Sequence, residues 1–369
     1  MEKQRICIIG DGLAGLTTAI AISNLNNVKV DLISKKSKKK PDNRTTAISE
    51  SNLNFLKANI LRLNKKLFWP SKNIELYYET KKEKINFLNL KEENKNLMYV
   101  YENEKFKNVL LKELKLNKIK VIKKEIKDLE FTNNYDLTIL CLGRRSKVYD
   151  KIIDLRAIKK DYEEIAITGH INHNLKKINT SQFFLREGPL AILPFSKNKL
   201  SFVWSLRKDF YNKNTNKIEI LVKEKIKNIL RIKNNVKVSN FQSYPIHLNL
   251  ERKYYSKNIL ILGEGLHTVH PVAGQGFNLV LRDIKKLKEI LKYYSSLGIS
   301  IKNSNALYDF YNERKPENII FGLGIDVTHN FFKENKYLDP LKEIILKNIS
   351  KNDMIKRITK IISNQGLSI

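Results

Sequence analysis

Apolar residues in the first 34 positions follow the periods of a strand, a helix and a second strand. Residues 6–9 form a continuous apolar run, which is typical of a central parallel strand, and residues 13–25 carry apolar side chains at helical spacing. Residues 28–33 supply the second strand. This order predicts a βαβ unit at the start of a doubly wound sheet.

The later part of the chain changes to a β-rich pattern and back. Residues 74–90 alternate in strand fashion around a charged turn at 81–84, which predicts a hairpin, and residues 165–206 contain several strand segments. Residues 258–262 return to a buried strand. Further helices are expected at 50–63, 106–116 and 216–232, and further strands at 118–122 and 135–143.

We therefore expect an α/β fold in which a β-rich substrate domain is inserted into a Rossmann-like domain, with helices at the C-terminal end. The predicted boundaries are 1–70, 91–155 and 256–300 for the Rossmann-like domain, 71–90 and 156–255 for the insertion, and 301–369 for the helices. A chain of 369 residues is long enough for two cores.

Three glycines lie between the first strand and the first helix at the spacing of a dinucleotide-binding loop. Gly10 would permit the tight turn, Gly12 would let a pyrophosphate approach the backbone, and Gly15 would let helix and strand touch. The free N–H groups at the helix N-terminus favour an anion. Ser34 ends the second strand where an acidic residue usually holds the ribose, and its hydroxyl can hydrogen-bond more weakly.

A second glycine-rich segment, residues 263–283, follows the strand at 258–262 and ends in a helical pattern. It contains four glycines and a proline, and it begins with an acidic residue, Glu264. Such a segment would present a carboxylate and then a helix N-terminus to one ligand.

Together the two segments resemble the FAD motifs of flavin-dependent aromatic hydroxylases with the p-hydroxybenzoate hydroxylase fold. The second is especially similar to the ubiquinone-biosynthesis branch, in which an acidic turn precedes His, Pro, Gly-Gln-Gly, Asn-Leu and Arg-Asp. Residues 42–49 resemble the arginine-containing segment of that branch, and residues 187–194 resemble its substrate-domain strands. The resemblance implies that FAD is bound by Gly10, Gly12, Gly15, Ser34, Arg44, Gly143, Glu264, Pro271, Gly274, Gly276 and Asn278.

The activity implied by this resemblance is hydroxylation of the aromatic ring of a prenylated phenol by dioxygen, through a flavin hydroperoxide. The helix that begins within residues 274–278 would stabilise the anionic reduced flavin, and the catalytic turn beside it would consist of Pro271, Gly274, Gln275 and Gly276. The sequence contains no second dinucleotide fingerprint, so NAD(P)H and a separate reductase both stay open as electron source.

Two departures from the family pattern leave other functions open. Leu142 precedes Gly143 where the family has an Asp, and Glu264 with Gly265 replaces an Asp followed by a small alanine. A degenerate flavoprotein that serves as a scaffold in a membrane-associated biosynthetic complex is one alternative. A flavoenzyme that acts on a prenyl chain is the other.

Several residues have structural interpretations that we prefer to functional ones. His267 and His270 lack nearby Cys or Asp partners, and Cys7 and Cys141 lie in apolar runs, so no metal site is predicted. Residues 282 and 283 are expected to form an ion pair on a helix surface. Trp204 is expected to be a core residue rather than a substrate platform, as is Phe183.

The net charge of +31 has three possible causes: a lysine-rich compositional bias, a nucleic-acid partner and an anionic membrane. We favour the bias, with residues 35–40 as a solvated loop, because no nucleic-acid recognition motif is present. No run approaches the ~20 apolar residues of a membrane span, and the first strand follows the initiator Met closely, so we expect a cytoplasmic protein. Residues 351–363 form an amphipathic basic helix that could contact the inner membrane, the protein's own body or a sister subunit. Assembly into a biosynthetic complex and formation of a homo-oligomer are both left open by the sequence.

Overall fold

The structure is a computed structural model that describes residues 3–35, 41–81, 83–126, 128–143, 146–152, 157–232, 236–334, 337–349 and 351–366. Most of the lysine block predicted as a loop, residues 36–40, lies outside the described residues, as do Arg144 and Arg145 beside the middle motif.

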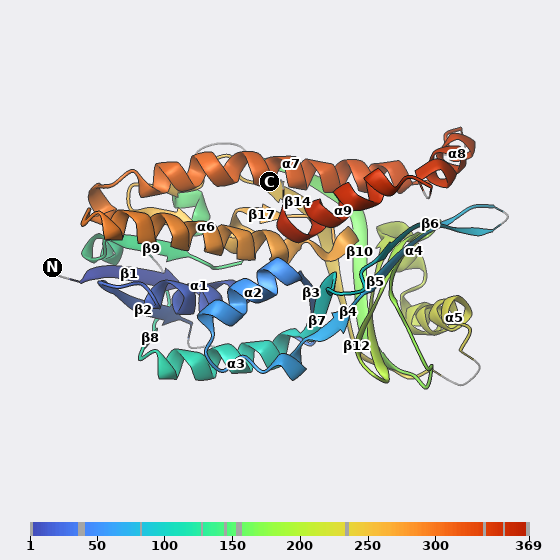
Figure 1. Ribbon diagram of the computed structural model, residues 1–369, viewed down its shortest axis with the longest axis horizontal. Coiled ribbons are helices and arrows are strands. Elements are labelled where there is room, and N and C mark those ends of the chain that lie inside the picture. Colours follow the sequence, from blue (N-terminus) through green and yellow to red (C-terminus); the bar gives the residue numbers. More distant parts are fainter. Residues whose placement is uncertain are drawn as a thin grey trace.

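A six-stranded sheet forms the centre of the first part of the molecule (Figure 1). Its order is β15 (Tyr255–Ser256), β16 (Ile259–Ile261), β9 (Leu137–Leu140), β1 (Gln4–Ile9), β2 (Val28–Ser34) and β8 (Lys120–Lys123). All neighbours pair in parallel except β15 with β16. The last four residues of β1 are buried, as expected for a strand covered on both faces.

Helices cover this sheet and fix the position of the two glycine segments. α1 (Leu13–Ser23) packs against β1 and β2 and has α3 (Asn103–Leu116) and α6 (Gly276–Ser296) as helical neighbours. α7 (Ala306–Phe332) lies along α6, as Figure 1 shows. α2 (Glu50–Asn59) ends earlier than predicted, and at its end the Asn59 side chain donates a hydrogen bond to the Phe55 carbonyl.

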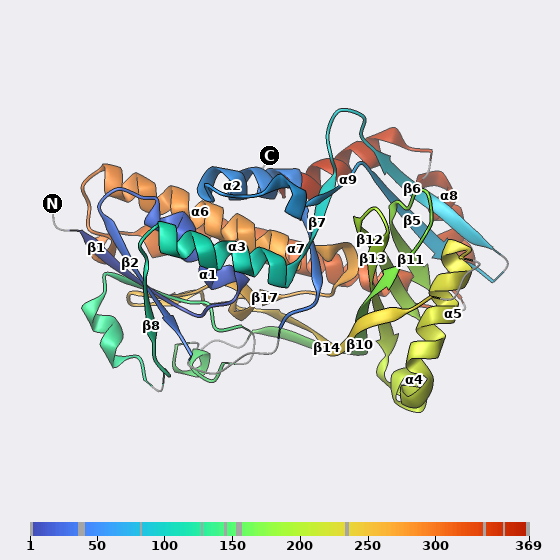
Figure 2. The ribbon, with the colours of Figure 1, turned by 90° about the horizontal axis from the view of Figure 1, so that it is seen from below.

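An eight-stranded sheet forms the second part (Figure 2). Its order is β17 (His267–Thr268), β14 (Val238–Leu250), β10 (Ile158–Asn172), β13 (Lys199–Arg207), β12 (Gly188–Ser196), β11 (Thr180–Leu185), β5 (Asn73–Glu79) and β6 (Lys84–Lys91). The hairpin predicted at 74–90 is confirmed as β5 and β6, and it joins the sheet through parallel pairing of β5 with β11.

The two faces of this sheet have different neighbours. α4 (Lys208–Lys213) and α5 (Ile218–Leu230) lie on the side turned away from the six-stranded sheet (Figure 2). Ile218, Val222 and Ile226 of α5 pack there in one cluster with Trp204 and Phe183, so both aromatic side chains are core residues as expected. Part of the opposite face packs against α7, where the Phe184 ring stacks on the Phe332 ring with centroids 3.6 Å apart.

The remaining elements join the two parts. A small antiparallel sheet of β3 (Thr45–Ser49), β7 (Met98–Glu102) and β4 (Trp69–Ser71) lies between them. After α7 come α8 (Asp339–Ile349) and α9 (Asp353–Gln365), and α9 returns along α2 (Figure 1). The α/β fold with an inserted β-rich sheet is therefore confirmed. Among the described helices, none combines the length and the apolar character needed to span a bilayer.

Candidate active site

One cavity of about 1080 Å³ lies between the two large sheets. Both predicted glycine segments line it, the first through Gly12 and the second through Pro271 and residues 274–278. The inner face of the eight-stranded sheet lines it as well, and so does one side of α9. The two glycine segments, residues 10–15 and 263–283, thus open onto the same space although they are far apart in the sequence.

The glycines of the first loop have separate structural roles. Gly10 has a φ of +122°, and a Cβ atom there would lie 2.1 Å from the Cys141 carbonyl oxygen. A Cβ atom on Gly15 would lie 2.0 Å from the Gly10 carbonyl oxygen, so this glycine lets α1 touch the loop. Neither residue lines the cavity, whereas Gly12 does, and a Cβ atom on Gly12 would meet nothing within 4 Å. Only Gly12 has open space for a ligand above its backbone.

The N-termini of α1 and α6 both face this cavity without a side-chain cap. Gly12 is the N-cap of α1 and Gln275 that of α6, and neither helix has an acidic residue in its first turn. A Cβ atom on Gly276 would also meet nothing within 4 Å. Two helix N-termini with open space above their glycines fit a ligand that carries negative charge at two separate positions, as a flavin dinucleotide does on its central pyrophosphate and its reduced flavin ring.

Asn278 holds the second turn in place. Its Nδ2 donates to the carbonyl oxygens of Ala47 at 3.0 Å and Gly274 at 3.2 Å, and its Oδ1 accepts from the Ser49 backbone N–H at 2.9 Å. The side chain is 3% exposed. Asn278 therefore ties α6 to β3 and shapes the wall on which a flavin would lie.

The two departures from the family pattern are linked through Tyr149. The Leu142 backbone N–H donates to the Tyr149 hydroxyl at 3.0 Å. The same ring covers Gly265, where a Cβ atom would lie 2.6 Å from the ring. Because residue 265 is a glycine, the Tyr149 ring fits over it. The Tyr149 hydroxyl in turn accepts a hydrogen bond from the backbone of Leu142, which stands where the family has an Asp. The Glu264 carboxylate lines the cavity close to Gly143, which also lines it.

Arg44 also lines the cavity, but its charge is already balanced. Its Nε and Nη2 donate to the two carboxylate oxygens of Asp42 at 2.7 and 2.8 Å, and its guanidinium lies 5.0 Å from the centre of the Tyr244 ring. Burial alone would raise the pKa of Asp42, yet the contacts with Arg44 hold that pKa below its usual value. The phosphate contact predicted for Arg44 stays a prediction.

The structure does not bring Ser34 to the cavity. The residue is 2% exposed and does not line the space, and its Oγ has no hydrogen-bond partner among the described residues. Of the sequence-predicted cofactor residues, Gly10, Gly15 and Ser34 lie behind the cavity wall and the others line it.

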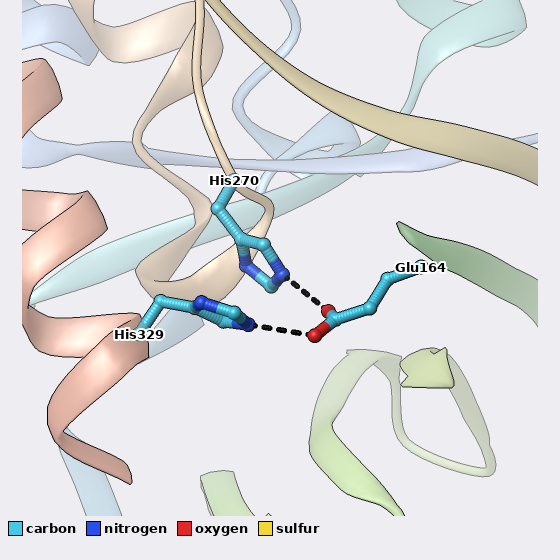
Figure 3. A group of neighbouring side chains, drawn as sticks. All are labelled: Glu164, His270 and His329. Atoms are coloured by element: carbon cyan, nitrogen blue, oxygen red, sulfur yellow. Dashed lines mark hydrogen bonds and ion pairs between the residues drawn. The ribbon is translucent and has the colours of Figure 1, made fainter. Parts of the chain in front are cut away.

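His270, another residue of the second glycine segment, belongs to a buried triad with Glu164 and His329 (Figure 3). Its Nε2 lies 3.0 Å from Glu164 Oε2, and the Nε2 of His329 lies 2.9 Å from Glu164 Oε1. Burial lowers the pKa of His270 to about 4, so its ring is neutral at neutral pH. Burial would raise the pKa of Glu164, but the two histidines lower it to about 2.

The hydrogen-bond pattern of the triad favours a positioning role over metal binding. The three ligand atoms lie within 4.8 Å of one another, which a metal ion could use. However, the Val272 backbone N–H donates to His270 Nδ1 at 3.1 Å, so the ring proton must be on Nε2, where it is donated to Glu164. A metal ion bound to Nε2 would require the ring proton to be on Nδ1, where two donors, this proton and the Val272 N–H, would face each other. The triad thus fixes His270 and, through it, the turn at 271–274.

Arg282 and Asp283, which were expected to pair on the surface of α6, are instead buried and bind other residues, so that prediction was wrong. Asp283 is 0% exposed, its Oδ2 lies 2.6 Å from His267 Nε2, and its Oδ1 accepts from Arg314 Nε at 2.7 Å. Arg282, 7% exposed, donates to the backbone carbonyls of Ile362 and Ser363 in α9. The expectation failed because α7 covers this side of α6, which the pattern of α6 alone does not show.

Sequence reasoning missed Glu164 and His329. Glu164 lies on β10 and His329 near the end of α7, 165 positions apart, and only the tertiary fold brings them together. The structural role preferred for His267 and His270 agrees with their hydrogen bonds to buried carboxylates.

Comparisons with known proteins agree with this geometry. A family model described as squalene epoxidase matches residues 206–364. The chain is 26% identical over 221 residues to the ubiquinone biosynthesis monooxygenase COQ6 of Dictyostelium discoideum, an alignment that covers 47% of this chain and 44% of that protein. It is 30% identical over 186 residues to the ubiquinone hydroxylase UbiL of Rhodospirillum rubrum, covering 48% of this chain and 42% of that protein.

The solved structures identify the fold. The p-nitrophenol 4-monooxygenase PnpA of Pseudomonas putida DLL-E4 superposes with a TM-score of 0.78 over 100% of both chains, at 15% identity. The chain therefore has the fold of this monooxygenase. The sequence resemblance to the ubiquinone-biosynthesis hydroxylases is confirmed. The chain spans less than half the length of these two curated relatives.

Proposed function

We propose that this protein is an FAD-dependent monooxygenase that hydroxylates the aromatic ring of a prenylated phenol in ubiquinone biosynthesis. The observation that carries the proposal is the single cavity lined by both glycine segments and by the inner face of the eight-stranded sheet. A cofactor at the glycine segments and a ring against the sheet would share one space, as oxygen transfer between them requires.

The residues that would hold the cofactor follow from the two helix N-termini. Gly12 and the start of α1 would bind the pyrophosphate, Glu264 would bind the ribityl chain, and the turn at 271–276 would lie against the flavin ring. The positive end of α6 would stabilise negative charge on that ring. Bound flavin would supply the electrons that activate dioxygen, with NAD(P)H or a separate reductase as their source.

The proposal includes contact with an anionic membrane that holds the prenylated substrate. On α9, Met354 is 65% exposed and Ile358 is 47% exposed, and basic side chains lie between them in the sequence. The same helix lines the cavity with Thr359 and Ile361. A membrane-bound α9 would therefore place the bilayer next to the cavity wall.

Absorbance and FAD titration of the purified protein test the cofactor part. Flavin bands in the isolated protein, or saturable uptake of added FAD, are expected. A colourless protein that does not take up FAD would favour the scaffold alternative. In a strain that lacks the protein, an under-hydroxylated quinone precursor should accumulate, and normal quinone levels there would contradict the ring-hydroxylase function.

A second candidate reaction is oxygen transfer to the prenyl chain. The match of residues 206–364 to the squalene epoxidase model favours it, because that name describes epoxidation of a polyprenyl hydrocarbon. The position of the incorporated oxygen in the product distinguishes the two reactions.

A further inference from the structure

The pairing of the strands defines which side chains of the eight-stranded sheet face the cavity. In-register neighbours share a face of a sheet, so a row of side chains can be followed from strand to strand. One row that lines the cavity from β5 to β10 consists of Leu76, Gln182, Ala191, Val203 and Thr168. A neighbouring row contributes Thr180, Ser201 and His170 to the same wall.

The polar side chains in these rows are buried, and two of them have unused hydrogen-bonding capacity. Gln182 is 7% exposed, and its amide contributes to no hydrogen bond among the described residues. Thr180 is 4% exposed, and its Oγ1 has no partner among the described residues. For the Thr180 hydroxyl, a buried group without a partner, the missing hydrogen bond costs ~1–3 kcal/mol, so a ligand that supplies it is favoured there.

The same wall carries no positive charge, although the chain contains 69 Lys and Arg residues. Neither row contains a Lys or Arg, and burial lowers the pKa of His170, which keeps its ring neutral. Elsewhere on the cavity lining, Arg44 is paired with Asp42, the Nζ of Lys360 lies 2.8 Å from Glu92 Oε1, and Lys95 is exposed in the segment between β6 and β7. A carboxylate placed against these rows would lose its hydration without gaining a counter-charge.

We propose that this wall binds an aromatic ring whose polar substituents are uncharged hydroxyl or ether groups, with Gln182, Thr168 and Thr180 as hydrogen-bonding partners, and that it excludes ring carboxylates. The inference rests on the proposed function for the presence of an aromatic substrate, and it adds the charge state of that substrate and the residues that select it. Gln182 is central to the row because its amide can donate to an ether or hydroxyl oxygen and accept from a hydroxyl group.

A matched pair of ligands tests the charge selection directly. 5-Pentylresorcinol and 2,4-dihydroxy-6-pentylbenzoate share the ring, the hydroxyl groups and the apolar tail and differ by one carboxylate. Calorimetric titration of the FAD-loaded protein should give a Kd for the resorcinol that is lower by at least about tenfold, equal to ~1.4 kcal/mol. Equal affinities, tighter binding of the benzoate, or binding of neither compound would overturn the inference.

Substitution of Gln182 tests the named residue. Gln182→Lys places a cation in the row and should shift the preference toward the benzoate by at least about tenfold, a gain that a purely structural role would not produce. Asn172→Lys is the matched control, because Asn172 is exposed on the same sheet and does not line the cavity. If Gln182→Lys does not fold, Gln182→Leu should weaken resorcinol binding without strengthening benzoate binding, and unchanged resorcinol affinity would contradict the assignment.

Failure of this inference and failure of the proposed function can be told apart, because binding is measured without turnover. A protein that distinguishes the two ligands and forms no hydroxylated product would contradict the proposed function alone. A protein that hydroxylates the resorcinol but binds both compounds equally would contradict the charge selection alone.

Discussion

The three glycines of the first loop should respond differently to the same substitution, because only one of them borders the cavity. Gly12 has φ −77° and ψ 177°, which alanine adopts without strain, and a Cβ atom there would meet no protein atom within 4 Å. Gly12→Ala should therefore change the free energy of unfolding by less than about 1 kcal/mol. Its methyl group would nevertheless occupy the space in which a pyrophosphate approaches the backbone.

Gly15→Ala provides the contrast. Its Cβ atom would lie 2.0 Å from the Gly10 carbonyl oxygen and 2.9 Å from the carbonyl carbon, so the loop and α1 must separate. Such overpacking costs ~1–3 kcal/mol or more. Gly15→Ala should lower the free energy of unfolding by at least that amount, whereas Gly12→Ala should leave it nearly unchanged.

The assay combines urea unfolding with FAD titration for each variant. We expect Gly12→Ala to raise the Kd for FAD by at least about tenfold at nearly unchanged stability. Gly324→Ala is the matched control, because Gly324 also has open space around its Cβ position but lies on α7 and does not line the cavity. Wild-type FAD affinity in Gly12→Ala, or an equal loss of affinity in Gly324→Ala, would refute this reasoning.

Three further predictions concern the buried interactions of the site. Glu164→Gln leaves one carbonyl oxygen for two imidazole N–H groups, so the free energy of unfolding measured with urea should fall by ~1.5–3 kcal/mol. The control variant Glu163→Gln, at the exposed neighbouring position, should match the wild type. The stability that His270 and Glu164 contribute should be fully present above pH 6.5. It should decline on acidification as the pH falls toward the His270 pKa of about 4 and the Glu164 pKa of about 2, because the unfolded chain binds protons more readily at both groups. A urea midpoint that is flat or rises between pH 7.5 and pH 5 would contradict this. Gly265→Ala should cost ~1–3 kcal/mol beside Tyr149 and less in a Tyr149→Ala background, where only the contact with Ile261 Cγ2 at 2.8 Å remains, and an equal cost in both backgrounds in a double-mutant cycle would disprove the coupling.

The elements that were predicted correctly from sequence are those whose structure depends on residues close together in the chain. The loop from Gly10 to Gly15 and the turn from Pro271 to Gly276 each combine a strand end, glycines and a helix start within a few residues. The alternation of residues 74–90 likewise contains all the information that a hairpin needs. Local pattern was sufficient for these elements, and it also placed Trp204 in the core.

The parts that were missed depend on contacts between distant segments. Glu164 and His329 meet only because β10 and α7 come together in the fold. Asp283 was expected at the surface because the pattern of α6 shows one apolar stripe and does not show that α7 covers the adjacent side. The burial of Ser34 behind the cavity wall is likewise a result of packing in three dimensions.

Incorporation of isotopically labelled dioxygen tests the central claim most directly. The FAD-loaded protein would be supplied with reductant, labelled dioxygen and a short-chain prenylated phenol, and the product analysed by mass spectrometry. We predict one labelled oxygen atom on the aromatic ring, and none when FAD is omitted. Label on the prenyl chain, or unlabelled phenol recovered from a protein with bound and reducible flavin, would contradict the account.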